Sequence, residues 1–407
     1  MSVRETIARL ARFDVLLLTA GIWFLAKFLR YAFPPLFDSF QAGYGVSNAA
    51  LGTAFTGFML VYAAMQFPSG VLADRLGPIT VVTAGALVAA SAALALAVDA
   101  AFPVLVAAML AMGAGTGAHK TVAVRLLARA YPARTGRALG VLDTFGAFGG
   151  VVAPAAVVAA AGLPFLFVDG WRAIFLVAGL LGFGLAAAFR FRIPARSPST
   201  ADHGDAANHG GSVRRYAALF RDRQFSAFAL LTVLFSFTYN GVVAFAPLYL
   251  TREAGLTRTT AGILYSGLFL ASLVQLVTGD LSDRIGRLPI VVATLSLASV
   301  SLLAFVSLTG TGSAILLGGT LVAVGLGSHG FRPVRGAYLM AAIPDDVAGG
   351  GLGIVRTLLM AAGAVAPAVV GVLSDIAGFR PAFWLLAGSI TGATLLGAAL
   401  WALENRP

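Results

Sequence analysis

Basic side chains stand inside segments that are otherwise long enough and apolar enough to cross a membrane. Lys27 and Arg30 lie in the first such segment, Lys120 in the fourth and Arg332 in the tenth. A charge at the centre of a bilayer costs at least ~2.5–3.5 kcal/mol on insertion scales, so it is tolerated mainly where it faces a wet cavity or a partner. Arginine binds a carboxylate or phosphate through two hydrogen bonds, and lysine supplies a point charge. The chemistry that these residues offer is the recognition of an anion.

Few acidic side chains are present to balance these charges. Asp143 is the acid that lies clearly inside an apolar segment, whereas Asp14 and Asp280 lie near segment ends. Like charges repel strongly where the dielectric constant is low, and a bound anion would relieve that repulsion. We therefore predict a substrate site built from the four basic residues. We also predict that Asp143 contacts Lys120, because the two lie on consecutive segments at similar depths.

An alternative interpretation is that the long basic side chains extend along the protein to the membrane surface. It suits Arg125 and Arg335, which lie close to a segment end. It suits Lys27 poorly, because Lys27 lies roughly in the middle of its segment. The sequence favours the anion site for Lys27.

Other polar side chains on the same segments are candidates for orienting a substrate. Histidine titrates near neutral pH and can relay protons, although a packed, neutral histidine is equally compatible with the sequence. We predict coupling to protons through Asp143 or a histidine. The additional substrate-site candidates are Tyr31, His119, Tyr239, Asn240 and His329.

The composition identifies the elements that must position these residues. Of 407 residues, 59% are hydrophobic and 11% charged, whereas soluble proteins carry roughly a quarter charged residues. A membrane-spanning helix needs ~20 apolar residues, and the chain divides into twelve such segments. The expected helices are Phe13–Leu36, Asn48–Leu72, Ile79–Val98, Phe102–Leu127, Arg137–Ala160, Arg172–Phe191, Phe225–Leu250, Thr259–Leu281, Pro289–Leu308, Ser313–Met340, Gly351–Ile376 and Ala382–Leu403.

The net charge of +11 has a distribution that argues against a nucleic-acid partner. Arginines gather in alternate loops, which is typical of the cytoplasmic side of a membrane protein. The intervening loops hold only Arg172, Arg252, Arg258 and Arg380. We therefore expect a multi-pass protein of the cell membrane with both termini in the cytoplasm and the lipid bilayer as its surroundings.

A charged turn occurs twice, about half a chain apart, each time between two apolar segments. Glycines at its ends permit close helix approach and a tight turn, and its aspartates can face a helix N-terminus. Internal repeats of this kind build many transporter folds. The two copies contain Gly70, Asp74, Arg75 and Gly77, and Gly279, Asp283, Arg284, Gly286 and Arg287.

Further landmarks repeat in the same order. Pro34–Pro35 and Pro247 are expected to end the first and seventh helices, and a Gly-x-Gly in the fourth helix, at Gly113, matches one in the tenth, at Gly325. Lys120 and Arg332 also fall at matching positions of the two halves. Together these repeats indicate a duplicated bundle.

On these motifs the chain resembles the major facilitator superfamily over nearly its whole length, although Pro78 stands where that family usually has a basic residue. The resemblance implies an all-α integral membrane protein with twelve transmembrane helices in two pseudo-symmetric six-helix bundles. It implies an alternating-access transporter whose cavity is lined mainly by helices 1, 4, 7 and 10. It also implies that Asp74 forms a cytoplasmic gate with the start of helix 11, with Arg356 as a partner.

The expected domains are an N-terminal bundle over 1–193, a flexible cytoplasmic linker over 194–223 and a C-terminal bundle over 224–407. We expect a secondary transporter for a small organic anion that works as a monomer without a cofactor, metal or catalytic residue. One alternative is a proton-driven exporter of drug-like or amphipathic compounds, but the stretch at Met109–Gly113 and the spacing of Gly149-Gly150 from Pro154 depart from that group's patterns. A membrane-embedded enzyme or a sensor is the other alternative.

Overall fold

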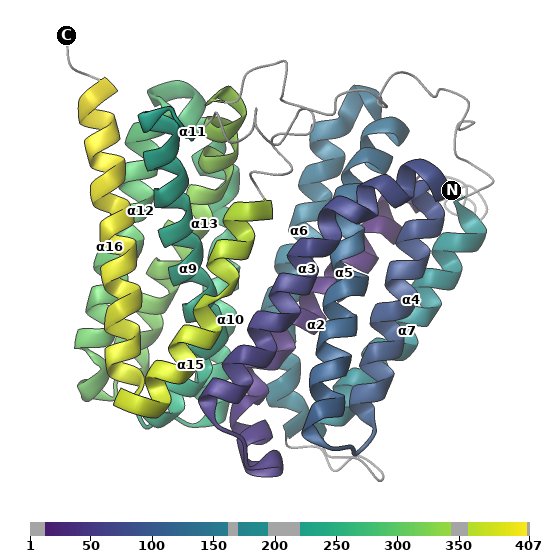
Figure 1. Ribbon diagram of the computed structural model, residues 1–407, viewed down its shortest axis with the longest axis horizontal. Coiled ribbons are helices and arrows are strands. Elements are labelled where there is room, and N and C mark those ends of the chain that lie inside the picture. The colour runs from purple at the N-terminus through teal and green to yellow at the C-terminus, as the bar shows by residue number, and fades with distance from the viewer. Residues whose placement is uncertain (1–12, 162–169, 194–219, 343–356, 405–407) are drawn as a thin grey trace, which may run out of the picture. The chain divides into compact units, whose positions relative to one another are not determined.

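The protein folds as helices, with no strand among the residues that its computed structural model describes, which are 13–161, 170–193, 220–342 and 357–404. Within those residues, twelve helical segments are long and apolar enough to cross a membrane, as predicted (Figure 1). The segments are Asp14–Tyr44, Asn48–Leu76, Pro78–Ala97, Phe102–Ala130, Pro132–Ala161, Gly170–Arg192, Arg223–Arg252, Arg258–Ile285, Arg287–Ser307, Ala314–Ala342, Thr357–Ala377 and Phe379–Glu404.

Two helices continue through the prolines near their expected ends, so that α2 (Asp14–Tyr44) runs past the expected Leu36 to Tyr44 and α9 (Arg223–Arg252) runs past the expected Leu250 only to Arg252. Helix α2 includes Pro34 and Pro35, and α9 includes Pro247. Proline cannot donate to the carbonyl four residues earlier, which for Pro247 is Val243. The hydroxyl of Tyr265 in α10 (Arg258–Leu270) donates to that carbonyl at 2.7 Å. A neighbouring side chain therefore replaces the lost bond, as is common in membrane helices.

The described chain forms two compact units. The first unit comprises Met1–Ala32 and Gly57–Gly204, and the second comprises Phe33–Thr56 and Asp205–Pro407. The start of α2 and the end of α3 (Asn48–Leu76) thus belong to the first unit, whereas the end of α2 and the start of α3 belong to the second. The predicted domain boundaries at residues 193 and 223 stay a prediction.

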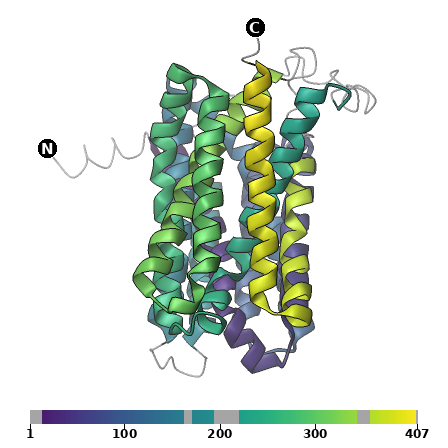
Figure 2. The same ribbon diagram turned by 90° about the vertical axis from the view of Figure 1, so that its left-hand side faces the viewer.

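Equivalent glycines pack the helices of each unit. In the first unit α5 (Phe102–Ala130) approaches α3 so closely that a Cβ on Gly113 would lie 2.5 Å from the carbonyl oxygen of Phe58. In the second unit α13 (Ala314–Ala342) approaches α10 equally closely. A Cβ on Gly325 would lie 2.5 Å from the carbonyl oxygen of Leu268. Figure 2 views the helices of the second unit that follow residue 220, drawn in teal, green and yellow. The repeated glycines of the sequence therefore mark the same helix contact in both units.

The remaining helices complete these bundles. In the first unit α4 (Pro78–Ala97) packs along α5 and α7 (Gly170–Arg192), and α6 (Thr135–Ala161) contacts α5 and α7. In the second unit α12 packs along α13 and α16, and α15 contacts α9 and α16. The helices of the second unit whose bounds have not yet been given are α11 (Gln275–Ile285), α12 (Arg287–Ser307), α15 (Ala366–Ala377) and α16 (Phe379–Glu404).

The repeated charged turns have the conformation that their second glycines predict. Gly77 and Gly286 adopt φ of 84° and 98°, a region that side chains other than glycine rarely enter. The expectation for the first glycines was wrong. A Cβ on Gly70 or Gly279 would find its nearest neighbour at 3.9 Å, which is ordinary contact, so these two positions do not bring helices into close approach.

Candidate functional site

One face of α2 carries alternating aromatic and cationic side chains that meet a lysine of α5. Lys27 Nζ lies 4.7 Å from the centre of the Trp23 ring, and Lys120 Nζ lies 5.0 Å from the same ring. Lys27 also lies 5.5 Å from the Tyr31 ring. Both ammonium groups gain cation–π attraction, which is larger where water is excluded. We call Trp23, Lys27, Arg30, Tyr31 and Lys120 the α2 cluster.

Arg30 is the most deeply placed cation of the α2 cluster. It is 7% exposed, its Nη2 lies 3.8 Å from the sulfur of Met59, and its guanidinium carbon lies 5.4 and 5.7 Å from the rings of Tyr31 and Tyr62. Met59 and Tyr62 were not predicted. They lie three residues apart on α3 and therefore on one helix face.

Lys120 of α5 and Asp143 of α6 form an ion pair, so the predicted contact between them is present. The two partners differ in environment, because the lysine side chain is 12% exposed and the aspartate 64% exposed. Asp143 therefore lies at the edge of the α2 cluster, where water and protons can reach it.

His119 is packed against the same indole. Its ring stacks on Trp23 with centroids 5.9 Å apart, and it is 2% exposed. Its Nε2 lies 3.0 Å from the carbonyl oxygen of Thr19, so Nε2 carries the hydrogen and donates it. Among the described residues, its Nδ1 has no hydrogen-bond partner. These contacts favour a neutral, packed histidine over a proton relay.

Helix α6 holds the indole in place through glycines one and two turns beyond Asp143. A Cβ on Gly146 would lie 2.3 Å from Trp23 Nε1, and a Cβ on Gly149 would lie 2.5 Å from the carbonyl oxygen of Phe24. Only glycine allows α6 to lie this close to α2. The same helix therefore supplies Asp143 and fixes the ring on which the two ammonium groups lie.

The second unit contains its own cationic and aromatic group. The Arg332 guanidinium lies 4.4 Å from the Tyr239 ring, and the same ring meets His329 edge-on at 5.8 Å. Tyr239 and Asn240 are 6% and 8% exposed. The guanidinium carbon of Arg335 lies 5.8 Å from the centre of the Phe235 ring, so the guanidinium group packs against an aromatic side chain. Four of the predicted residues, Tyr239, Asn240, His329 and Arg332, thus lie on α9 and α13 of one unit.

Two of the predicted gate residues form ion pairs within their own unit. Asp74 accepts hydrogen bonds from Arg125 at 2.6 and 3.3 Å, and both lie in the first unit. In the second copy, Arg284 pairs with Asp280 at 2.8 Å. The Asp74–Arg125 pair ties α3 to α5. The expected partner Arg356 lies outside the described residues, so the gate at the start of helix 11 stays a prediction.

Asp283 and Arg287 of the second turn line a surface hollow of about 470 Å³. Tyr338, Trp401 and Glu404 line the same hollow, so this turn borders the ends of α13 and α16. Arg75 of the first turn is exposed.

The sequence matches the Major Facilitator Superfamily over residues 19–328 and 228–407. The chain belongs to this superfamily of membrane transporters. It is 27% identical over 379 residues to a probable sulfoacetate transporter, SauU, of Cupriavidus necator, covering 87% of this chain and 85% of that protein. It is 25% identical over 357 residues to a putative metabolite transport protein of Haemophilus influenzae, covering 85% and 83%.

Solved structures share the fold at lower identity. The nucleoside transporter NupG has a TM-score of 0.79 at 13% identity, covering 95% of this chain and 99% of that one. A bacterial homologue of the human lysosomal transporter Spinster, in an inward-facing and occupied conformation, has a TM-score of 0.78 at 16% identity, covering 96% of each chain. The protein is therefore a multi-pass membrane protein with the fold of this superfamily.

Proposed function

We propose that this protein is a secondary transporter that moves a small organic anion across the cell membrane by alternating access, coupled to protons. The observation that carries the proposal is the charge of the α2 cluster. Lys27, Arg30 and Lys120 lie there against aromatic rings, and Lys120 pairs with Asp143.

The α2 cluster suits an anion for electrostatic reasons. Three cationic groups near one another in a low-dielectric region raise one another's energy, and a bound anion offsets that repulsion. The aromatic rings of Trp23 and Tyr31 supply apolar surface for the carbon atoms of a small organic molecule. The similarity to a probable sulfoacetate transporter supports a substrate with carboxylate or sulfonate groups.

The Lys120–Asp143 pair offers a route for proton coupling. While Asp143 is charged, it holds the Lys120 ammonium group. Once Asp143 is protonated, that group becomes available to the anion. The substrate and the Asp143 carboxylate thus compete for one cation, and binding of the anion favours binding of a proton.

The second unit contributes Arg332, which we propose as a further anion-binding residue. Its guanidinium lies against Tyr239, which restricts its rotation and presents a planar pair of donors. Tyr31, Tyr239, Asn240, His119 and His329 are proposed to shape and orient the substrate rather than to carry its charge.

Uptake into proteoliposomes tests the proposed function. Labelled carboxylates, sulfonates, phosphate esters and inorganic anions are offered with and without a pH gradient, beside neutral and cationic solutes of similar size. We expect a small organic anion to accumulate when the outside is acidic. Accumulation of a neutral or cationic compound instead, with no anion transported, would support the drug-exporter alternative.

Anion binding at different pH values tests the coupling. We expect the affinity of the wild-type protein to rise as the pH falls, because the protonated form of Asp143 leaves Lys120 to the anion. Asp143→Asn should bind tightly at every pH and lose the response of uptake to a pH gradient. Asp99→Asn is the matched control, because Asp99 also pairs with a cation of the first unit, Arg172, at 2.5 Å. Identical pH dependence of Asp143→Asn and wild type would contradict the competition.

A further inference from the structure

Arg332 and Arg335 lie one helical turn apart on α13, and each lies against an aromatic ring of α9. The guanidinium carbon of Arg332 lies 4.4 Å from the centre of the Tyr239 ring, and that of Arg335 lies 5.8 Å from the centre of the Phe235 ring. Residues three or four positions apart share one face of a helix. The rings of Phe235 and Tyr239 are stacked with their centroids 6.1 Å apart. Two cations of one helix therefore lie on two neighbouring rings of another.

The Arg335 side chain extends toward the middle of its membrane-spanning helix. Its guanidinium carbon also lies 5.9 Å from the centre of the Phe331 ring, one turn earlier on α13. Phe235 follows the first residue of α9 by twelve positions, which is about 18 Å along the helix axis. A side chain that reached the membrane surface would instead extend toward Ala342, where α13 ends. These contacts place the charge of Arg335 inside the span.

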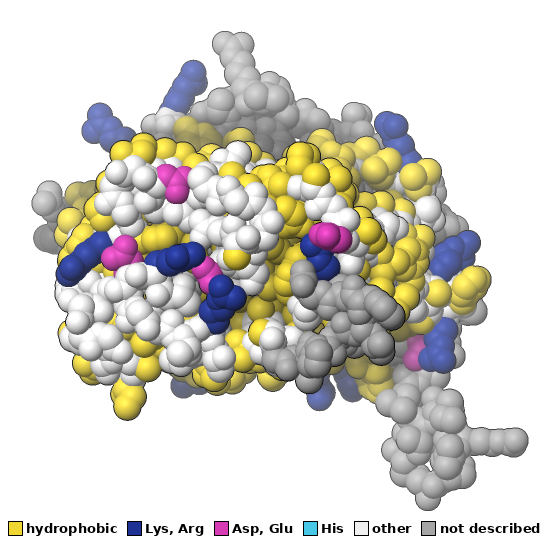
Figure 3. All heavy atoms as spheres, turned by 90° about the horizontal axis from the view of Figure 1, so that it is seen from below, with side chains coloured by type: hydrophobic (Ala, Val, Ile, Leu, Met, Phe, Trp, Pro, Cys, Tyr) yellow, Lys and Arg dark blue, Asp and Glu magenta, His cyan; other side chains and the backbone are white. Residues whose placement is uncertain are grey.

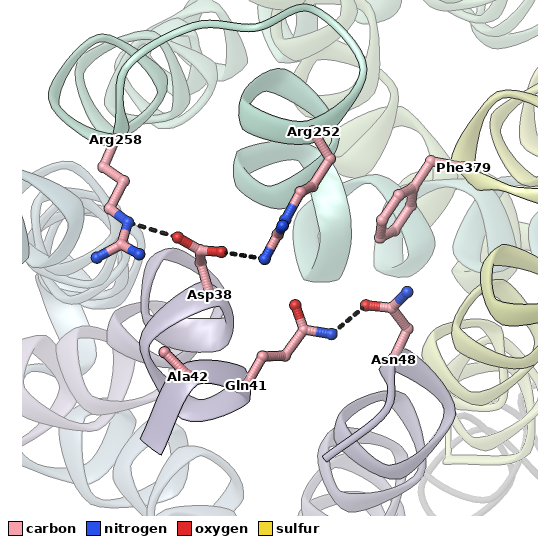
Figure 4. Close-up of a pocket in the computed structure, with 7 residues that line it drawn as sticks. All are labelled: Asp38, Gln41, Ala42, Asn48, Arg252, Arg258 and Phe379. Carbon is pink, nitrogen blue, oxygen red and sulfur yellow. Dashed lines mark hydrogen bonds and ion pairs between the residues drawn. The ribbon is translucent and has the colours of Figure 1, made fainter. Parts of the chain in front are cut away.

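Other arginines of the second unit are held by a carboxylate. Basic and acidic side chains lie next to one another on the face of the molecule that Figure 3 shows. Asp38 accepts a hydrogen bond from Arg252 at 2.6 Å and pairs with Arg258 (Figure 4). An aromatic ring attracts a guanidinium group and orients it without adding a negative charge. The rings of α9 and α13 hold Arg332 and Arg335 in this second way.

Arg335 belongs to the second half of the sequence repeat alone. Lys120 is the counterpart of Arg332, so the counterpart of Arg335 is Ala123, three residues after Lys120. Ala123 is fully buried. The first unit therefore forms its bundle with a methyl group at this position, and the fold does not require an arginine there. This difference favours a role in binding for Arg335.

Open space lies next to the two arginines. Gly336 follows Arg332 by four positions and therefore shares its helix face. A Cβ on Gly336 would meet no atom of the described residues within 4 Å. Arg332, Arg335 and Gly336 are all partly exposed. A small solute can therefore reach both guanidinium groups from this face of α13.

We propose that Arg332 and Arg335 form a two-cation site that binds an organic acid with two negatively charged groups. The proposal rests on the anion transport proposed above and narrows its substrate to a doubly charged acid. Each guanidinium group can bind one anionic group through a planar pair of N–H donors. Two like charges one turn apart on a helix repel each other. In a region of low dielectric constant, a substrate with two negative charges offsets more of that repulsion than one with a single charge.

Equilibrium binding of matched diacids and monoacids tests the site. The probes are malonate, succinate, glutarate and adipate, each beside its monomethyl ester, which has nearly the same size and one charge fewer. Isothermal titration at slightly alkaline pH, where both carboxyl groups of the diacids are ionised, gives the affinities. We expect at least one diacid to bind about tenfold or more tightly than its own ester, because it gains a second set of charge-assisted hydrogen bonds.

Substitutions of Arg335 assign the second charge to this residue. Arg335→Gln should weaken binding of that diacid about tenfold or more and change the affinity of its ester by less than about threefold. Arg335→Lys should restore part of the preference, because it keeps the charge without the planar donors. Arg190→Gln is the matched control, since it removes an exposed arginine in the last turn of α7. It should leave both affinities unchanged.

A second pair of variants tests the place of binding. Gly336→Leu fills the space beside Arg332 and should weaken binding of the diacid several-fold. Gly319→Leu on the same helix is the control, because a Cβ there also meets no atom of the described residues within 4 Å. It should bind the diacid like the wild type. Melting temperatures in detergent show whether each variant is folded.

The proposal is overturned if no diacid binds more tightly than its ester, or if Arg335→Gln weakens the diacid and the ester equally. An equal loss in Arg190→Gln would also overturn it, because any positive charge would then be sufficient. Binding of the esters without a preference for the diacids would leave the proposed anion transport intact. Binding of the neutral dimethyl esters alone would refute both proposals.

Discussion

Trp23 contacts two cationic side chains of the first unit. Its indole contacts Lys27, Lys120 and His119, and Gly146 fixes its edge. A side chain with a negative π face can hold two ammonium groups close together without neutralising them. The indole thus attracts the Lys27 and Lys120 ammonium groups without adding a negative charge, and Lys120 also pairs with Asp143.

The Lys120–Asp143 pair predicts unequal effects for its two partners. Asp143→Leu leaves the nearly buried Lys120 without its carboxylate and should lower the melting temperature clearly. Lys120→Met leaves a carboxylate that is already 64% exposed, so its effect should be smaller. The Lys120→Met, Asp143→Leu double variant should be more stable than Asp143→Leu alone. Thermal unfolding in detergent measures all three, and strictly additive losses would argue against an energetic contact.

Arg332 allows charge to be distinguished from geometry. Arg332→Met should weaken anion binding by about tenfold or more, since a charge-assisted hydrogen bond contributes ~1.5–3 kcal/mol. Arg332→Lys keeps the charge but loses the planar pair of donors that lies on Tyr239. Isothermal titration with the transported anion should therefore show a loss for both variants. Full affinity in Arg332→Lys would mean that only the charge matters.

At the scale of helices, close packing positions the site. Helix α6 carries Asp143 and, one turn later, the glycine that admits the Trp23 indole. The Lys27 and Lys120 ammonium groups both lie against the Trp23 ring. A substitution on α6 that displaces this ring should therefore also displace the two ammonium groups on α2 and α5.

Two glycines of α6 test this coupling between packing and binding. Gly146→Ala should displace the indole, shift the tryptophan fluorescence and weaken anion binding several-fold. Gly140→Ala on the same helix should do neither, because a Cβ there meets no atom within 4 Å. Equal affinities of the two variants would show that the position of Trp23 is not important for binding.

The sequence predicts helices better than it predicts their ends. Apolar length identified the twelve segments found among the described residues, and the repeated Gly-x-Gly marked the contact of α5 with α3 and of α13 with α10. The expected end of the first helix at Leu36 was wrong, because α2 continues through Pro34 and Pro35 to Tyr44. The support that Tyr265 gives to the backbone at Pro247 was also missed, because a donor on another helix cannot be recognised from local sequence.

Within the candidate site, the contact that the sequence predicted is the pairing of Lys120 with Asp143, from their similar depth on consecutive helices. The role of Lys27, Arg30 and Lys120 in binding a substrate stays a prediction. Met59 and Tyr62 around Arg30 were missed, because an uncharged side chain in an apolar helix carries no signal of its partner.

At the scale of the whole molecule, the arginine-rich loops predict the orientation in the membrane. Reporter fusions at Ala207 and at the C-terminus should both report the cytoplasm. They would then place the turn between α2 and α3 on the opposite side, since α2 crosses the membrane once between the N-terminus and residue 44. A periplasmic signal from either fusion would contradict the orientation.

The whole-molecule claim is that one transporter uses cationic residues from both sequence halves to bind an anion. The measurement that tests it most directly is equilibrium binding, to the purified protein and to the Lys27→Met, Arg332→Met double variant, of the anion that accumulates in proteoliposomes. The account predicts that the double variant loses anion binding by well over tenfold while its melting temperature stays close to that of the wild type. Undiminished binding of that anion by the double variant would contradict it, and the basic residues would then serve the fold alone.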